Sequence, residues 1–259
     1  MANNTLSQWF ESPLGQYLLA KEREYVDEVT PDIFGFHALQ LGLPEIDFLH
    51  ASRIAHRMRI SQDGRADLFA KGQELPFATQ SIDLMLLPHV FEFTAEAHAI
   101  LREVDRVMMP EGRLVIIGFN PWSLWGLRGA IGPGRNDYPW NGRFVSLPRV
   151  KDWLGLLGFD VSAGRLIAYA PPFDRESWRS RFGFMELAGD RWWAVGGAVY
   201  MLQAIKRVRG MRLITPAWQE KDAREKRLVA AAKRQAASPA RPEDVLSASK
   251  PAAHLRIVK

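Results

Sequence analysis

The chain has no cysteine among its 259 residues, and this absence excludes several kinds of chemistry. Without cysteine there is no disulfide framework, no thiolate nucleophile and no zinc site built from thiolates. The six histidines fall in no spacing that is typical of metal ligands, so we predict no metal site. Apolar residues make up 47% of the chain and charged residues 24%, a balance that indicates a folded globule with a sizeable core.

Long hydrophobic runs are also missing. The two longest uncharged stretches, Leu114–Leu127 and Trp192–Ile205, have only 14 residues each. A membrane-spanning helix needs roughly 20 apolar residues, so we predict no transmembrane segment. The N-terminal residues show neither the basic region nor the apolar region of a secretory signal. We therefore expect a cytoplasmic protein.

The net charge of +5 is unevenly distributed along the chain. Residues 206–259 contain 14 Lys and Arg against 5 Asp and Glu. Clustered basic side chains bind nucleic acid without sequence information, and they are also attracted to anionic membrane surfaces. A solvated tail without a partner is the third interpretation, and the composition leaves all three open. The low apolar content predicts a largely disordered tail over 211–259, after a helix at 220–235.

Hydrophobic periodicity predicts a helix followed by alternating strands and helices. After the N-cap candidate Ser12, residues 13–29 have helical spacing and Pro31 closes the run. Short apolar segments predict strands at 37–43, 56–60, 66–70, 81–88, 113–119 and 198–208. Helices are expected at 94–109, 149–157 and 175–188.

The succession of strand, helix and strand over residues 81–119 is typical of a right-handed crossover unit. We therefore predict an α/β protein with a doubly wound, Rossmann-like and mostly parallel sheet that has helices on both faces. Residues 1–32 form a helical lead-in, 33–210 the central domain and 211–259 the basic tail in this scheme.

The most specific pattern lies between Glu74 and Pro121. Ordered motifs follow one another there: LPF at 75–77, SID at 81–83, HVFE at 89–92, LREV at 101–104 and PEGRL at 110–114. In this order they resemble the type 11 branch of class I S-adenosylmethionine-dependent methyltransferases. A subset of these proteins also has the strings LQLG and GFNPxSLWGLR, matched at 39–42 and 118–128. The resemblance implies a sheet of seven strands, one of them antiparallel, and S-adenosyl-L-methionine as the cofactor.

Ligands of open α/β sheets bind outside the carboxyl ends of the strands. The resemblance places cofactor contacts at these ends, at Gln40, Gly42, Asp63, Gln73, Leu75, Pro88 and His89. Gly42 lets the backbone approach the methionine moiety without a side-chain clash. Asp63 is the candidate acceptor for the ribose hydroxyls and Gln73 the candidate for adenine. An ordinary turn aspartate is the alternative interpretation of Asp63.

The loop after the first strand departs from the family pattern. Gln40 stands where the family has an acidic residue, and Pro44 and Ile46 replace two loop glycines. Lys71 stands where an acidic residue often faces adenine. These departures keep a second class of function open, a non-catalytic protein of the same fold that binds a partner, RNA or a membrane surface. An open cleft over Gly42 favours the enzyme, whereas occlusion by Pro44 or Ile46 favours the binding protein.

His89 is the candidate catalytic base, because its unperturbed pKa lies near neutrality. The alternative is a histidine at the entry of a helix that bonds to the backbone. Glu92 is either a ligand-binding residue or a first-turn glutamate that interacts with the helix dipole.

The segment 121–147 is rich in Trp, Gly and Arg, and we predict that it forms a lid over the acceptor. Candidate acceptor contacts are Asn120, Trp122, Tyr138 and Trp140. Such aromatic side chains suit a small-molecule or lipid-like acceptor, although an interface or a packing cap explains them equally well.

Overall fold

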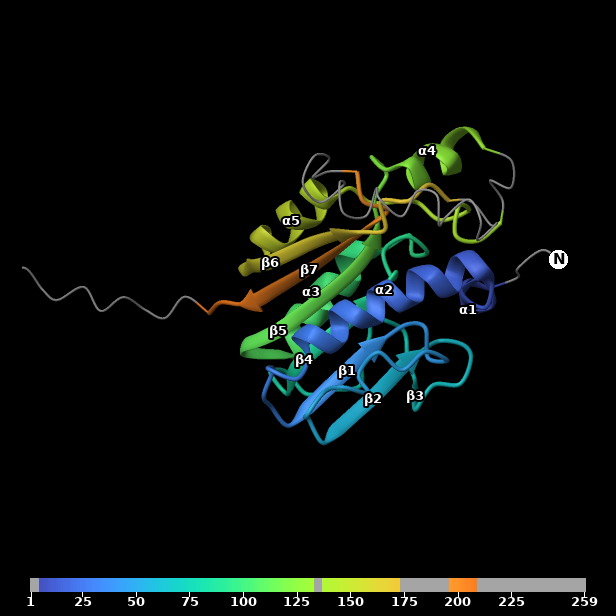
Figure 1. The fold of residues 1–259 in the computed structure, drawn as a ribbon. Helices are drawn as coiled ribbons and strands as arrows, with labels where there is room; N and C mark the ends of the chain where they lie inside the picture. The colour runs from blue at the N-terminus through green and yellow to red at the C-terminus, as the bar shows by residue number, and fades with distance from the viewer. Residues whose placement is uncertain (1–4, 133–136, 173–195, 209–259) are drawn as a thin grey trace, which may run out of the picture. The chain divides into compact units, whose positions relative to one another are not determined.

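The structure is a computed structural model that describes residues 5–132, 137–172 and 196–208 (Figure 1). The chain divides into two compact units, residues 1–209 and 210–259, and all described residues belong to the first. The helices expected at 175–188 and 220–235 and the tail over 211–259 lie outside the described residues.

Seven strands form a single sheet in the order β3-β2-β1-β4-β5-β7-β6 (Figure 1). Strand β7 runs antiparallel to both of its neighbours, β5 and β6, and the other four pairs are parallel. This arrangement confirms the predicted Rossmann-like sheet. The strands are β1 His37–Leu41, β2 His56–Ser61, β3 Leu68–Phe69, β4 Ile82–Pro88, β5 Met108–Phe119, β6 Phe159–Ile167 and β7 Val199–Lys206.

Two apolar clusters cover the two faces of this sheet. Successive residues of a strand point to opposite faces, and Leu84 and Leu86 of β4 accordingly join one cluster while Met85 and Leu87 join the other. The first cluster includes the helices α1 and α2, and the second includes α3 and α5. The described helices are α1 Leu6–Phe10, α2 Pro13–Val29, α3 Ala97–Val107, α4 Leu124–Ile131 and α5 Leu147–Leu156.

The helix α2 confirms the predicted N-terminal helix together with its cap. The Ser12 side chain accepts a hydrogen bond from the Gly15 amide at 3.1 Å, as an N-cap residue does. The buried face of α2 is apolar except for one glutamate, Glu22, which is completely buried. The C-terminal half of the helix is held to β7 by a hydrogen bond of 2.9 Å from Gln203 to the Tyr25 hydroxyl.

Several boundaries differ from the sequence prediction. Strand β5 begins at Met108, five residues before the predicted start, because the Pro110-Glu111-Gly112 turn is absorbed as an irregularity in the pairing with β4. The short helices α1 and α4 were not predicted, since five and eight residues give too little periodicity to recognise. Within the described ranges, no helix is long and apolar enough to cross a membrane.

Candidate functional site

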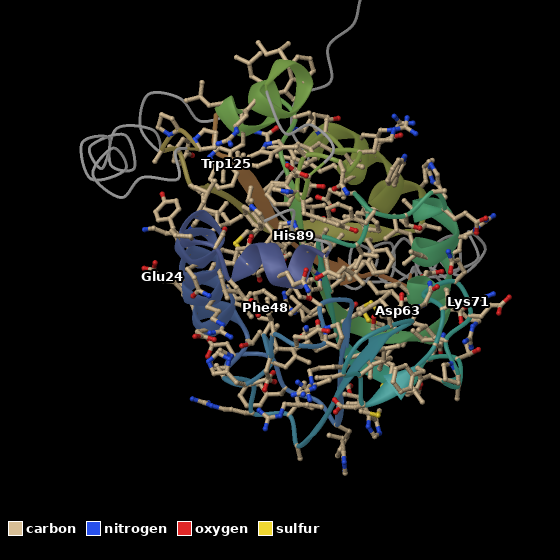
Figure 2. The ribbon with its side chains drawn as sticks, turned by 90° about the vertical axis from the view of Figure 1, so that its right-hand side faces the viewer. Glu24, Phe48, Asp63, Lys71, His89 and Trp125 are labelled. Carbon is tan, nitrogen blue, oxygen red and sulfur yellow. The ribbon has the colours of Figure 1, made fainter. Side chains whose placement is uncertain are left out.

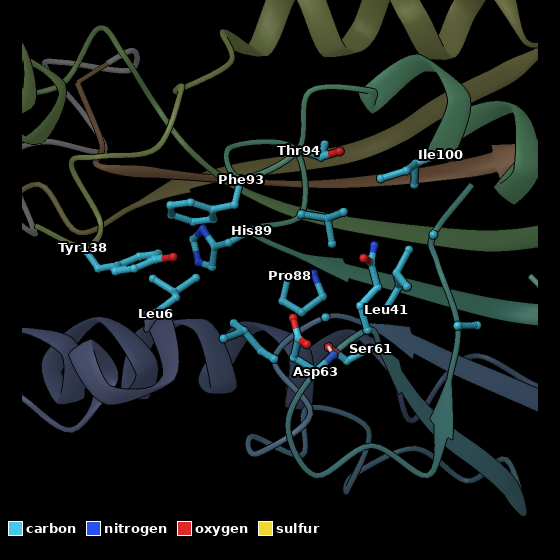
Figure 3. Close-up of a pocket in the computed structure, with 16 residues that line it drawn as sticks. Leu6, Leu41, Ser61, Asp63, Pro88, His89, Phe93, Thr94, Ile100 and Tyr138 are labelled. Atoms are coloured by element: carbon cyan, nitrogen blue, oxygen red, sulfur yellow. Dashed lines mark hydrogen bonds between the residues drawn. The ribbon is translucent and has the colours of Figure 1, made fainter. Parts of the chain in front are cut away.

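A pocket of about 340 Å³ opens at the carboxyl ends of the central strands (Figure 3). Its floor consists of residues 41–43 at the end of β1, residues 61–63 at the end of β2 and residues 88–90 at the end of β4. Strand order reverses between β1 and β4, and ligands of open α/β sheets bind at such a point. The volume falls within the range of about 300–1,000 Å³ that is typical of ligand sites.

Gly42 lies in this floor with a left-handed backbone, at φ +90°. A Cβ atom at this position would lie 3.3 Å from the Cγ2 atom of Val90 and 3.6 Å from the carbonyl oxygen of Pro88. The backbone angle therefore favours glycine, and a Cβ atom would in addition be in tight contact with the Val90 side chain. The Gly42 amide donates to the carbonyl of Ile60 at 2.8 Å, which holds the bare Cα against the pocket.

Asp63 also lines the pocket and is exposed to solvent. Figure 3 shows its side chain near Pro88, on the wall that β2 contributes. Within the described part of the chain its carboxylate makes no hydrogen bond or ion pair, and only its backbone amide is bonded, to the Ser61 hydroxyl at 3.3 Å. The carboxylate is therefore free to accept hydrogen bonds from a ligand.

Gln40 does not reach the pocket, contrary to the expectation that it contacts the cofactor. Its side chain is completely buried, and its amide nitrogen donates to the carbonyls of Gly42, Leu43 and Ile46 at 3.1, 3.0 and 2.8 Å. Its amide oxygen accepts the Phe48 amide at 3.1 Å. Gln40 thus holds the loop from inside, where a carboxylate would face three carbonyl oxygens.

The two residues that replace loop glycines leave the pocket open. Ile46 is buried in the apolar cluster under α1 and α2. Pro44 accepts a hydrogen bond from Arg59 at 2.9 Å through its carbonyl oxygen, and neither residue lines the pocket. The cleft over Gly42 is therefore open, which is the geometry expected of the enzyme.

The predicted adenine side of the pocket is made by other residues than expected. Ala70 and Gly72 line it, whereas Gln73 and Leu75 do not. Leu75 is buried in the core, where its amide donates to the Glu103 carboxylate at 2.8 Å. Lys71, like Gln73, is absent from the pocket wall and is exposed at the edge of the molecule (Figure 2).

Pro88 and His89 line the pocket at the end of β4. His89 has a left-handed backbone at φ +52°, which is uncommon for a residue other than glycine. Its side chain has no exposed surface and lies in the middle of the molecule (Figure 2). Its Nε2 atom is 2.8 Å from the Oε1 atom of Glu22, across 67 residues of sequence. The alternative expectation was that the His89 side chain bonds to the backbone. The structure instead shows it in contact with the Glu22 carboxylate.

The Glu22 contact changes the protonation of His89. Burial alone lowers the pKa of the imidazole, but the adjacent Glu22 carboxylate and, to a smaller extent, Glu92 outweigh it and raise the pKa to about 9. Burial likewise raises the pKa of Glu22, and the His89 charge acts against this shift. His89 is accordingly an imidazolium at neutral pH. The sequence signal for this pair is the single glutamate in the apolar face of the helix at 13–29.

Glu92 completes this buried group. It precedes α3 by several residues, so the interpretation as a first-turn helix residue is wrong. Its Oε1 atom accepts the Phe119 amide at 2.6 Å and lies 3.9 Å from the Nδ1 atom of His89. The Tyr200 hydroxyl and Glu92 Oε1 both lie against the Cα of Gly118, where a Cβ atom would clash with each.

The outer wall of the pocket is apolar and aromatic. It consists of Leu6 from α1, Phe93 and Tyr138, and the two rings lie 5.1 Å apart between centroids (Figure 3). Tyr138 is therefore the one predicted acceptor residue that lines the pocket. Phe93 and Leu6 were not predicted, and nothing in their sequence spacing singles them out.

The other three predicted acceptor residues do not line the pocket. Asn120 is buried, donates to the Gly197 carbonyl at 2.9 Å and accepts the Trp122 amide at 3.1 Å. The Trp122 side chain is 72% exposed and lies outside the pocket. Trp140 stacks under the guanidinium of Arg128, which lies 4.2 Å from the ring centroid.

No group of three or more potential metal ligands occurs among the described residues. The site is thus an open pocket with the exposed carboxylate of Asp63 and the bare Cα of Gly42. The buried group of Glu22, His89 and Glu92 lies next to its floor.

Comparison with known proteins agrees with this geometry. Residues 45–116 match the model of the type 11 methyltransferase domain family. The uncharacterized protein YafS of Escherichia coli strain K12 is 38% identical over 156 residues, which cover 59% of this chain and 65% of that protein. The match thus spans less than two thirds of this curated relative.

Two solved structures share the fold. An S-adenosylmethionine-dependent methyltransferase from Thermotoga maritima, described as a possible histamine N-methyltransferase, is 15% identical with a TM-score of 0.58, and the match covers 77% of this chain and 94% of that one. A geranyl diphosphate methyltransferase in complex with S-adenosylmethionine is 12% identical with a TM-score of 0.51, over 74% and 87% of the two chains. At these identities the likeness shows the fold alone.

Proposed function

We propose that this chain, which has the fold of class I S-adenosylmethionine-dependent methyltransferases and matches their type 11 domain over residues 45–116, is itself a methyltransferase. Its pocket would bind S-adenosyl-L-methionine, whose sulfonium supplies the methyl group. The observation that carries the proposal is the open floor at Gly42, where the backbone turns at φ +90° and the substituted loop residues point away.

The residues of the pocket fit such a cofactor. The bare Cα of Gly42 gives the amino-acid moiety close access to the backbone. Asp63, at the end of the neighbouring strand, has a carboxylate without a partner among the described residues, and this carboxylate suits the two ribose hydroxyls. Leu41 and Ile100, with Gly72 between them, make an apolar surface on which a flat base would pack.

The contribution of the chain to catalysis is mainly positioning. Holding two reactants in the productive geometry supplies about 7–11 kcal/mol in favourable cases, so methyl transfer needs no side-chain nucleophile. The candidate base His89 is already protonated at neutral pH, and an imidazolium accepts no further proton. We therefore propose that His89 shapes the floor of the pocket and its charge rather than serving as the base.

The acceptor in this proposal is a small molecule or a lipid-like molecule. Leu6, Phe93 and Tyr138 offer an apolar and aromatic surface at the mouth of the pocket. Ring faces of this kind bind planar or aliphatic groups by area burial and stacking. The polar residues Thr94 and Gln62 at the same pocket are available for orientation.

Calorimetric titration with S-adenosylmethionine and S-adenosylhomocysteine tests the proposal. We expect micromolar binding by the natural chain and its loss in Gly42→Trp, because the indole would fill the floor. Gly155→Trp is the matched control, since a Cβ atom at Gly155 meets no other atom within 4 Å. Binding that survives in Gly42→Trp would place the cofactor elsewhere.

The second candidate is a non-catalytic protein of the same fold that binds a partner, RNA or a membrane surface. The observation in its favour is Gln40, whose amide is entirely used inside the loop and offers a cofactor no charge. No binding of either nucleoside ligand at millimolar concentration would favour it. Binding of nucleic acid or anionic vesicles through the basic residues 206–259, and a cytoplasmic location, remain parts of this proposal.

A further inference from the structure

The pocket has little negative charge of its own. Asp63 is the single carboxylate among its lining residues, and it is exposed to solvent. Under the proposed function the ligand before transfer carries a sulfonium cation, and the ligand after transfer is a neutral thioether. The two ligands are otherwise the same except for one methyl group. Any charge fixed near the pocket therefore distinguishes them.

A fixed charge is present directly beneath the floor of the pocket. Glu22, His89 and Glu92 come from α2, the end of β4 and the turn that follows it, and none of their side chains has exposed surface. The imidazole lies 2.8 Å from one carboxylate and 3.9 Å from the other. One proton shared by Glu22 and His89 leaves that pair neutral overall, and the Glu92 carboxylate adds one negative charge.

This buried group is unusual because several of its polar atoms lack a hydrogen-bond partner among the described residues. Glu22 Oε2, Glu92 Oε2, His89 Nδ1 and the Tyr200 hydroxyl have no hydrogen-bond partner within the described part of the chain. Buried polar atoms are nearly always paired, and buried charges cost several kcal/mol each. An apolar residue at position 22 would continue the buried face of α2 without this cost. A charge that is kept in such a place calls for a functional explanation.

We propose that Glu92, together with the Glu22–His89 pair, supplies the buried negative charge that makes the pocket prefer the sulfonium form of the ligand over the neutral thioether. This inference rests on the proposed function. Gln40 has no charge with which to attract the cofactor's cation. The inference assigns this role to Glu92 in the turn after β4, beside Glu22 on α2. A carboxylate in the interior is poorly screened by solvent, so its field extends into the adjoining pocket.

The test compares two ligands in one isosteric variant. Glu92→Gln removes the charge and keeps an oxygen for the Phe119 amide. We expect S-adenosylmethionine to bind about five- to tenfold more weakly, because its cation loses the attraction of one poorly screened charge, and S-adenosylhomocysteine to change less than about twofold. Glu28→Gln is the control, because it removes the same charge from the exposed end of α2.

Glu22→Gln provides a second variant that leaves the Glu92–Phe119 bond intact. At pH 8, burial removes the proton from a His89 that has no Glu22 carboxylate beside it, so Glu92 still supplies one negative charge and this variant should keep the selectivity for the sulfonium ligand. An unchanged ratio of the two affinities in Glu92→Gln, an equal loss for both ligands in that variant, or a loss of selectivity in Glu22→Gln would overturn the inference while leaving the proposed function standing. Failure of the natural chain to bind either ligand would overturn both.

Discussion

The Nε2 atom of His89 lies 2.8 Å from the Oε1 atom of Glu22, and neither side chain has any surface exposed to solvent. The contact joins the end of β4 to the middle of α2, so it connects the pocket floor to the N-terminal helix. Removing one partner of such a buried pair leaves an uncompensated charge or forces the other partner to become neutral.

Stability should therefore fall at alkaline pH. The pKa of His89 is raised to about 9 in the folded chain, against about 6.5 when unfolded, so the native state holds the proton more tightly. The resulting stabilisation is complete below pH 6.5 and is lost as the pH rises to 9, at about 1.4 kcal/mol per pKa unit. Urea unfolding at pH 6, 7.5 and 9 measures this decline. No thiol titrates in the same window, because the chain has no cysteine.

The double variant of Glu22→Gln and His89→Gln identifies the source of the decline, because it also removes the buried Glu22 carboxyl, whose own pKa is raised by burial. Its unfolding free energy should be lower at pH 6 and should vary little between pH 6.5 and 9. A curve as steep as that of the natural chain would show that another group titrates there. His50→Gln is the control, since His50 contacts Asp27 in a half-exposed position.

Restoring an acidic residue at position 40 should damage the protein. In Gln40→Glu a buried carboxylate would replace the amide that donates to three carbonyl oxygens, and it would be repelled by all of them. We expect a loss of about 3–5 kcal/mol, as for other uncompensated buried charges. Chemical denaturation measures it, and Gln62→Glu, an exposed position in the same pocket, should change stability by less than about 0.5 kcal/mol. An increase in cofactor affinity without loss of stability in Gln40→Glu would contradict this view of the loop.

Asp63→Asn should weaken cofactor binding without affecting stability. The carboxylate is exposed and has no partner among the described residues, so the fold loses nothing with its charge. A charge-assisted hydrogen bond is about twice as strong as a neutral one, and we expect about a tenfold loss of affinity for both nucleoside ligands. Calorimetry measures this loss. Asp67→Asn is the control, and it should lower stability without changing cofactor affinity, because Asp67 is bonded to Arg59 at 3.1 Å within the fold. Unchanged binding by Asp63→Asn would leave Asp63 as an ordinary turn residue.

The LPF turn should matter for stability and not for ligand binding. Glu103 accepts the Leu75 amide at 2.8 Å and pairs with Arg106, whose hydrogen bond lowers the pKa of the Glu103 carboxyl. Glu103→Gln should cost about 1–2 kcal/mol, because charged hydrogen bonds of this kind contribute about 1.5–3 kcal/mol. The affinity for S-adenosylmethionine should stay the same. A loss of affinity with unchanged unfolding would return Leu75 to the list of cofactor contacts.

The fold was predictable where local signals and burial agree. Ser12 and the apolar spacing after it define α2, and the uninterrupted apolar run in β4 identifies a strand buried on both faces. The boundary of β5 was missed because a proline and a glycine within it predict a turn, whereas the sheet accommodates them as a pairing irregularity.

The site was predictable only in part. Gly42, Asp63, Pro88 and His89 follow from the positions of strand ends along the chain, and the pocket brings them together. Sequence position does not tell which way a side chain turns, so Gln40 and Leu75 were placed in the pocket although they face the interior. Glu22 stands out as a glutamate in the apolar face of a helix, but its pairing with His89 could not be predicted because the two residues lie 67 positions apart.

The position of α2 also bears on how this domain can be divided. The family match begins at residue 45, after β1 and after the helix that carries Glu22 and follows Leu6. A fragment cut at that boundary would lack α1 and α2, so one apolar face of the sheet would be exposed. The pocket would lose Leu6 from its wall, and His89 would lose its counterion Glu22. Any minimal version of this protein, and any chimaera that borrows its site, has to keep α1 and α2 in the same unit as the sheet.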